Sequence, residues 1–221
     1  MGEKERNKMP ENPEREALFN HWSESYQEDV SDGQFPFIGY EHTLDQLIQS
    51  SGIQSTHRVL DLGIGTGALG LRLPIPQEQL WGVDFSAAML ARAAEALPRA
   101  HLLQVDLLSE KWAAELDQPF DRIISGYTFH EFTDEQKLAI LSRLVAGHLA
   151  RDGVIQIADI SFETEADFDA GHQRFAAAWD EEEFYWCAER MVSRMVALGF
   201  SVNYTQTSDC AGIYSITRMG E

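Results

Sequence analysis

Three closely spaced glycines, Gly63, Gly65 and Gly67, end the segment VLDLGIGTG at residues 59–67. An apolar run that leads into glycines predicts a buried strand followed by a tight turn. Glycine lets the backbone turn sharply and lets a ligand approach main-chain N–H groups that a Cβ atom would block. Asp61, near the end of this strand, suits a cationic group of such a ligand. A glycine-rich loop alone is a weak indication of a ligand site, so the neighbouring residues determine which ligand it predicts.

Two further carboxylates, Asp84 and Asp106, follow the next two apolar runs, QLWGV and HLLQV. A carboxylate after the second strand can accept hydrogen bonds from both hydroxyls of a ribose. One after the third strand can accept a hydrogen bond from an adenine amino group. Ligands of open parallel sheets bind beyond the carboxyl ends of the strands. Either aspartate alone could be a helix N-cap or a loop carboxylate, but together with the glycine run they predict a nucleoside site.

The elements that must position these residues alternate between short apolar strands and amphipathic helices. Strands are predicted in the segments HRVLDLG, QLWGVD, HLLQVD, FDRIISG and GVIQIADI. Helices are predicted at SAAMLARAAEAL, with Ser86 as the N-cap, and at TDEQKLAILSRLVAGHLA, where Thr133 and Gln136 form a capping box. Pro74 and Pro76 interrupt the first crossover, so its helix should be truncated. This alternation implies a parallel sheet covered on both faces.

The end of the chain has a different pattern. A helix is predicted from about residue 181 to 198, ending at Gly199, and two strands follow it, FSVNYTQT and AGIYSITR. The few residues between these strands are too short for a crossover, so the strands must be antiparallel neighbours. The predicted fold class is therefore α/β: a Rossmann-like, doubly wound, seven-stranded mixed sheet. It has five parallel-type strands plus a terminal antiparallel hairpin, with helices on both faces.

The composition limits the classes of function. The chain has 221 residues and a net charge of −19. The electrostatic field of such a charge repels phosphate backbones, which argues against a nucleic-acid partner. Cys187 and Cys210 form no CxxC pair, so neither a disulfide framework nor a metal site is predicted. No segment has the pattern of a signal peptide or a membrane span, so we expect a cytoplasmic protein with no membrane partner. The sequence carries no signal for an oligomeric state.

The glycine run and the strand-end acids resemble those of class I S-adenosylmethionine (AdoMet)-dependent methyltransferases over about residues 57–160. Residues 120–127 (FDRIISGY) are similar to the family's fourth-strand motif. A closer similarity, to small uncharacterised bacterial proteins of the YrrT-like group, rests on the segments FNHW at 19–22, GYEH at 39–42 and YTFHEFTDE at 127–135. The resemblance implies AdoMet as cofactor and S-adenosylhomocysteine (SAH) as product. It implies the following cofactor-binding residues: Asp61, Gly63, Gly65, Gly67, Asp84, Phe85, Met89, Asp106, Leu107, Ser125 and Tyr26.

The implied reaction is direct in-line attack of an acceptor atom on the sulfonium methyl group. The protein then has mainly to position the two partners and exclude water. His130 and Tyr127 are the candidate catalytic residues, with Glu131 beside them. His130 would act as a general base for a neutral acceptor, and Tyr127 would act as a base or shield the methyl group. Either side chain could equally be structural. We expect a small-molecule acceptor; the sequence leaves the element of its reacting atom open.

The pattern divides the chain into three parts. Residues 1–14 are a polar lead-in that we expect to be disordered, and residues 15–56 hold two helices expected to form a lid over the cofactor. Residues 57–221 form the AdoMet-binding methyltransferase domain, with a cap segment at about 161–186. Aromatic and acidic side chains are mixed in this cap. They could line an acceptor pocket with an anionic rim, or form an amphipathic surface helix with a solvated acidic face.

Two other functions are compatible with the same residues. The segment GTGALG at 65–70 satisfies the dinucleotide pattern GxGxxG, and Asp84 lies near the distance expected for NAD. In an NAD-dependent oxidoreductase, however, the third-strand acid and the terminal hairpin would have no role. The negatively charged pyrophosphate of NAD would also lie close to the carboxylates of Asp61 and Asp84. The other alternative is a catalytically silent protein that binds AdoMet as a sensor or interaction module.

Overall fold

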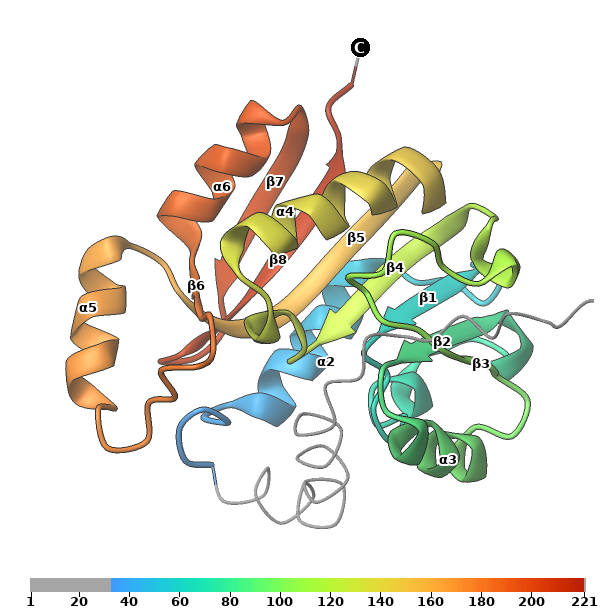
Figure 1. Cartoon of the computed structure of the whole chain (residues 1–221), viewed down its shortest axis with the longest axis horizontal. Coiled ribbons are helices and arrows are strands. Elements are labelled where there is room, and N and C mark those ends of the chain that lie inside the picture. Colours follow the sequence, from blue (N-terminus) through green and yellow to red (C-terminus); the bar gives the residue numbers. More distant parts are fainter. Residues whose placement is uncertain (1–32, 221) are drawn as a thin grey trace, which may run out of the picture.

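The computed structural model describes residues 33–220, which form a mixed sheet flanked by helices (Figure 1). The strand order along the sheet is β3-β2-β1-β4-β5-β8-β7. Strands β1 to β5 pair in parallel, whereas β8 lies antiparallel between β5 and β7. The predicted fold class is confirmed. The bounds of these strands are β1 Val59–Leu62, β2 Leu80–Asp84, β3 His101–Gln104, β4 Phe120–Gly126, β5 Leu149–Phe162, β7 Phe200–Gln206 and β8 Ala211–Arg218.

The helices begin and end at the residues that the local sequence favours. Ser86 caps α3 by accepting a hydrogen bond from the backbone N–H of Met89. Thr133 and Gln136 form the predicted capping box of α4. The first crossover, interrupted by prolines, holds two short 3₁₀ turns. The bounds are α2 Tyr40–Ser51, η1 Gly70–Arg72, η2 Gln77–Gln79, α3 Ala87–Ala96, η3 Ala114–Leu116, η4 Phe129–Glu131, α4 Asp134–Arg143, η5 Leu144–His148, α5 Glu165–Arg174 and α6 Ala188–Ala197.

The hydrophobic core consists of two clusters on opposite faces of the sheet. Because successive side chains of a strand point to opposite faces, Leu60 and Ile123 belong to one cluster, and Val59 and Ile124 belong to the other. Helices α4 and α6 contribute to the first cluster, and α2 contributes to the second. In Figure 1, α4 and α6 lie in front of the sheet and α2 lies behind it. Burial of both faces explains why the central strands are almost continuously apolar.

The helix predicted from about residue 181 begins only at Ala188, so this part of the prediction is wrong. The preceding residues form a short strand, β6 Trp186–Cys187, which pairs in parallel with Ser161 and Phe162 at the end of β5. Tyr185, Trp186 and Cys187 are all buried. An extended chain buries consecutive side chains on both of its sides, whereas an amphipathic helix would expose some of them. This strand lies off the main path of the sheet.

Helix α2 is the second helix predicted in the N-terminal part of the chain. It ends as expected at Gly52, which has a φ of 58°. The helix contacts β5 and β8, and the hydroxyls of Thr43 and Thr207 lie 2.8 Å apart. The polar lead-in, the first predicted helix and Tyr26 lie outside the described residues. Within residues 33–220, no helix is long and apolar enough to cross a membrane.

Candidate functional site

A cavity of about 340 Å3 lies at the carboxyl ends of β1 to β4. The strand order reverses between β1 and β4, and open parallel sheets bind ligands at such a switch point. Loops that follow the four strands build the wall, together with Tyr40 and Leu44 of α2. The volume lies in the range typical of small-molecule sites. The predicted site residues that line this cavity are Asp61, Gly63, Gly65, Asp84, Phe85, Met89, Asp106, Leu107, Tyr127 and His130.

The glycine loop forms one wall of the cavity. Gly63 and Gly65 have φ values of 69° and 53°, a conformation that side chains other than glycine rarely adopt. A Cβ atom on Gly63 would lie 2.2 Å from Oγ1 of Thr128, so the loop can lie against the segment after β4 only with glycine here. At Gly65 a Cβ atom would meet nothing within 4 Å. The loop therefore leaves its backbone accessible at the point where Gly65 lines the cavity.

Asp84 is held in place by the backbone around it. Its Oδ2 atom accepts a hydrogen bond from the N–H of Gly65 at 2.9 Å, and its Oδ1 atom accepts one from Ser86 at 2.8 Å. Burial raises the pKa of Asp84, while these backbone hydrogen bonds lower it. Each carboxylate oxygen still has a second lone pair, so both can accept another hydrogen bond.

Asp61 is the most unusual charged group of the cavity. It is 1% exposed, and its Oδ2 atom has no hydrogen-bond partner among the described residues. Burial, and then the negative charge of Asp84, raise the pKa of Asp61 to about 8. A buried carboxyl without a partner is unfavourable unless a ligand supplies a donor or a positive charge. The site is therefore suited to a cationic ligand.

The loop after β3 supplies Asp106 and Leu107. Oδ1 of Asp106 accepts a hydrogen bond from the N–H of Leu108 at 2.8 Å. The guanidinium of Arg143, at the end of α4, donates to the carbonyls of Leu107 and Ser109 and fixes the course of the loop. Phe85, between β2 and α3, and Met89, in the first turn of α3, also line the cavity. This part of the wall is apolar apart from the aspartate, which suits a flat base with one amino group.

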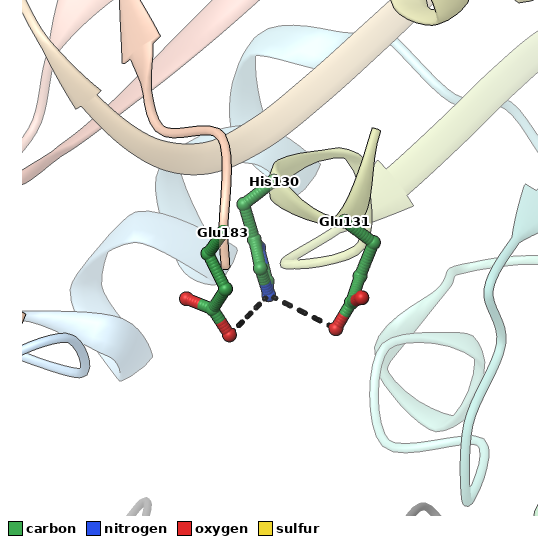
Figure 2. A group of neighbouring side chains, drawn as sticks. All are labelled: His130, Glu131 and Glu183. Carbon is green, nitrogen blue, oxygen red and sulfur yellow. Dashed lines mark ion pairs between the residues drawn. The ribbon is translucent and has the colours of Figure 1, made fainter. Parts of the chain in front are cut away.

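His130 lies at the other end of the site and is positioned by Asp159 of β5. Nδ1 of His130 lies 2.7 Å from Oδ1 of Asp159, and the backbone N–H of His130 donates to Oδ2 at 2.9 Å. On the other side of the ring, Nε2 lies 3.8 Å from Glu183 and 3.9 Å from Glu131, as Figure 2 shows. Burial alone would lower the pKa of His130, but Asp159, Glu183 and Glu131 raise it to about 9. The ring is thus mostly protonated at neutral pH, and its role as a general base stays a prediction.

Tyr127 follows β4 and has a φ of 52°, the only positive value of a residue other than glycine in the described part of the chain. Its ring lies 4.8 Å from that of Tyr40 and 6.0 Å from that of Phe37. Burial raises the pKa of the Tyr127 phenol above its usual range, although Thr43 lowers it in part. Unusual backbone conformations of this kind cluster at functional sites. A phenol that keeps its proton can donate a hydrogen bond or cover a ligand, but it is a poor base.

Two predicted cofactor-binding residues do not line the cavity. A Cβ atom on Gly67 would lie 2.8 Å from Cδ1 of Leu97, so this glycine lets the loop pack against the residue that follows α3. Ser125 is buried and donates to the carbonyl of Leu62 at 2.7 Å, joining β4 to β1. A third, Tyr26, lies outside the described residues. Gly67 and Ser125 thus support the wall of the cavity from behind.

The sequence singled out neither Asp159 nor Arg143, and it placed Glu183 only among the acids of the cap segment. An acid inside the apolar run GVIQIADI is a detectable signal, because a buried aspartate needs partners. Oδ2 of Asp159 also accepts a hydrogen bond from Nε1 of Trp186 at 3.2 Å. Glu183 carries no local signal, since it is one of several acids in the run DEEEF. Its position depends on the fold of the segment before β6.

Comparison with known proteins agrees with this arrangement. The profile of a family described as a methyltransferase domain matches residues 59–153. The chain is 32% identical to the uncharacterised methyltransferase YrrT of Bacillus subtilis (strain 168) over 206 residues, covering 87% of this chain and 92% of YrrT. It is 34% identical to an uncharacterised methyltransferase of Geobacillus kaustophilus (strain HTA426), covering 86% of this chain and 90% of the relative.

Solved structures support the fold. A complex of DhpI with SAH superposes with a TM-score of 0.68 at 17% identity, covering 93% of this chain and 96% of DhpI. Magnesium protoporphyrin IX methyltransferase from Synechocystis PCC 6803, with bound SAH, gives a TM-score of 0.65 at 17% identity, covering 94% and 100%. Fold and sequence together thus define a class I AdoMet-dependent methyltransferase. Within that class, the chain belongs to the YrrT-like family of uncharacterised bacterial methyltransferases.

Proposed function

We propose that this methyltransferase binds AdoMet in the cavity at the β1–β4 switch point and methylates a small-molecule acceptor. The observation that carries the proposal is a pair of carboxylates in one cavity, the buried Asp61 and the partly buried Asp84. Burial makes their negative charge unfavourable, so a ligand with positive charge gains affinity there. AdoMet carries an ammonium group and a sulfonium group. The pyrophosphate of NAD would instead add negative charge, which is why we do not favour an oxidoreductase.

Each part of AdoMet has a partner in the cavity wall. We assign Asp61, beside the glycine loop, to the amino-acid portion, and Asp84 to the ribose hydroxyls. Asp106 would accept a hydrogen bond from the adenine amino group. The side chains assigned to the faces of the base are Phe85, Met89 and Leu107. When bound, AdoMet would supply a methyl group that can pass to an acceptor atom, with the sulfur of SAH as the leaving atom.

The acceptor would lie at the end of the cavity formed by Tyr127 and His130. Both side chains are less than 10% exposed, at 8% and 4%, so this end is enclosed. An enclosed end favours a small acceptor and excludes water from the reacting atoms. Tyr127 is assigned to shielding the methyl group, and His130 to contact with the acceptor. We propose that the segment from α5 to β6 forms the cap at this end, because it places Glu183 beside His130.

Calorimetry with AdoMet and SAH tests the cofactor site. We expect Asp84→Asn to weaken AdoMet binding at least about 10-fold, since a hydrogen bond to a charged group contributes about 1.5–3 kcal/mol. The matched control is Asp117→Asn, which removes the same charge from an exposed site away from the cavity. Equal affinity of both variants for AdoMet would contradict the assignment of the cavity.

Transfer of a labelled methyl group tests the acceptor class. The protein is incubated with methyl-labelled AdoMet and a cell extract separated into metabolites, proteins and nucleic acids. Label in the metabolite fraction supports a small-molecule acceptor, and label in either macromolecular fraction contradicts it. Tight binding of AdoMet without any labelled product would favour the silent sensor.

A further inference from the structure

Three potential metal ligands converge where the turn after β4 lines the cavity. They are Nε2 of His130 and one carboxylate oxygen each of Glu131 and Glu183, and these atoms all lie within 4.8 Å of one another (Figure 2). His130 and Glu131 come from the η4 turn after β4, and Glu183 comes from the segment before β6. Residues that are far apart in the sequence thus direct their polar atoms to one point.

The backbone holds these two segments together. The N–H of Phe184 donates to the carbonyl of His130 at 2.7 Å, directly beside Glu183. The carbonyl of Phe184 accepts a hydrogen bond from Nζ of the buried Lys137. Because both backbone groups of Phe184 are engaged, the position of Glu183 relative to the imidazole is set by the fold. The three ligand atoms are therefore preorganised.

The histidine ring has the support that a metal-binding histidine needs. Nδ1 of His130 bonds to Asp159, which is fully buried and also accepts from the N–H of Ile160 and from Nε1 of Trp186. A carboxylate on one ring nitrogen orients the ring, and the other nitrogen can bind a metal once the metal has displaced its proton. Here that other nitrogen points at the two glutamates, which it approaches at 3.8 and 3.9 Å. These separations are too long for hydrogen bonds.

The charge around the ring also favours a cation. Three carboxylates, those of Asp159, Glu131 and Glu183, surround one imidazole. Lys137 is the nearby buried cation, but its Nζ is bound to the carbonyl of Phe184 and lies 3.7 Å from Asp134. A divalent cation in place of the Nε2 proton would add one more positive charge among these three carboxylates.

We propose that His130, Glu131 and Glu183 bind a divalent first-row transition-metal ion, for which Mn²⁺ is the probe. One imidazole and two carboxylates form a ligand set that suits such ions. Metal–ligand distances of about 2.0–2.2 Å place neighbouring ligand atoms roughly 3–4 Å apart, so the side chains would move by less than about 1 Å. His130 and Glu131 also line the methyltransferase cavity, and Glu183 lines a second cavity beside α5. The ion would lie between the two cavities.

Binding of Mn²⁺ to the full chain tests this site without AdoMet or any acceptor. After treatment with a chelator, the protein is titrated with Mn²⁺ at physiological ionic strength, and free Mn²⁺ is followed by electron paramagnetic resonance. We expect one equivalent of Mn²⁺ to bind with an affinity well above that of the weak background sites on an acidic surface. Glu183→Gln should weaken this binding at least 10-fold. The matched control, Glu182→Gln, removes the same charge from the exposed neighbouring residue and should leave the binding unchanged.

The proposal is overturned if the wild type shows only weak, multiple binding, or if Glu183→Gln and Glu182→Gln bind Mn²⁺ alike. Circular dichroism checks that each variant is folded, and Glu131→Gln replaces Glu183→Gln if the latter does not fold. Failure of this site is distinct from failure of the proposed methyl transfer, because AdoMet binding is measured separately on Asp84 variants.

Discussion

Replacing Asp61 with asparagine should stabilise the fold at neutral pH and weaken the binding of AdoMet. The side chain is 1% exposed, and its pKa is raised from 3.8 to about 8, by burial first and then by Asp84. A carboxyl with a higher pKa in the folded than in the unfolded state stabilises the fold while it is protonated. This contribution is therefore fully present below the unfolded value of 3.8 and is lost as the pH rises through about 8.

The size of the effect follows from the same pKa values. Each pH unit between them removes about 1.4 kcal/mol from the free energy of unfolding, so the loss at pH 7 is at most about 4 kcal/mol. Asparagine has nearly the same shape as aspartate and carries no charge to desolvate. Asp61→Asn should therefore gain about 2–4 kcal/mol at pH 7 and raise Tm by roughly 5–15 °C in a chain of this size.

Urea unfolding of the wild type and Asp61→Asn, followed by tryptophan fluorescence from about pH 4 to about pH 8, measures this gain. The difference in the free energy of unfolding between the two proteins cancels the contributions of groups that titrate alike in both. We expect a difference near zero at the acidic end that grows steadily toward the alkaline end. Parallel curves would refute the reasoning, because Asp61 would then titrate like an exposed carboxyl. Asp117→Asn is the control and should show no such slope.

The remaining predictions concern the cofactor, the glycine loop and the histidine. AdoMet affinity should rise as the pH increases toward about 8 and then level off, because a cationic ligand favours ionised Asp61; calorimetry that finds a constant Kd over this range would contradict it. Gly63→Ala should destabilise the fold by about 2 kcal/mol or more, since its Cβ would clash with Thr128 at a positive φ. Gly147→Ala, with open space around it, serves as the control in the same thermal melts. His130→Ala should reduce turnover about 100-fold and leave the Kd of AdoMet unchanged; an unaffected kcat would remove this residue from the chemistry.

The grouping of the strand-end acids around one cavity could be predicted because its signals are local. Asp61 stands beside the glycine loop, and Asp84 and Asp106 each follow an apolar strand. Parallel strands bring their carboxyl ends to one edge, so strand pattern alone is enough to place these residues together. The roles of Gly67 and Ser125 could not be separated in this way. Both belong to the motifs, yet one packs on Leu97 and the other bonds to a neighbouring strand.

The acceptor half could be predicted only in part, because tertiary contacts build it. His130 stood out by its type, but Asp159 meets it only because β5 pairs with β4. Glu183 reaches the ring because the segment before α6 is extended and β6 joins the end of β5. The sequence pattern there favoured a helix. Burial of Trp186 against Tyr214 and Asp159 outweighed that local preference.

The two ends of the cavity follow the same electrostatic logic. Burial raises the pKa of Asp61 and Asp84 at one end. At the other end three carboxylates raise the pKa of His130, so positive charge is favoured there as well. At the first end AdoMet would supply that charge. At the second end the protonated His130 supplies part of it, and a divalent ion in place of that proton would supply more. Filling the metal site should therefore favour an anionic acceptor and disfavour a cationic one. The effect of Mn²⁺ on methyl transfer to a candidate acceptor thus reports the charge of the acceptors that the site admits.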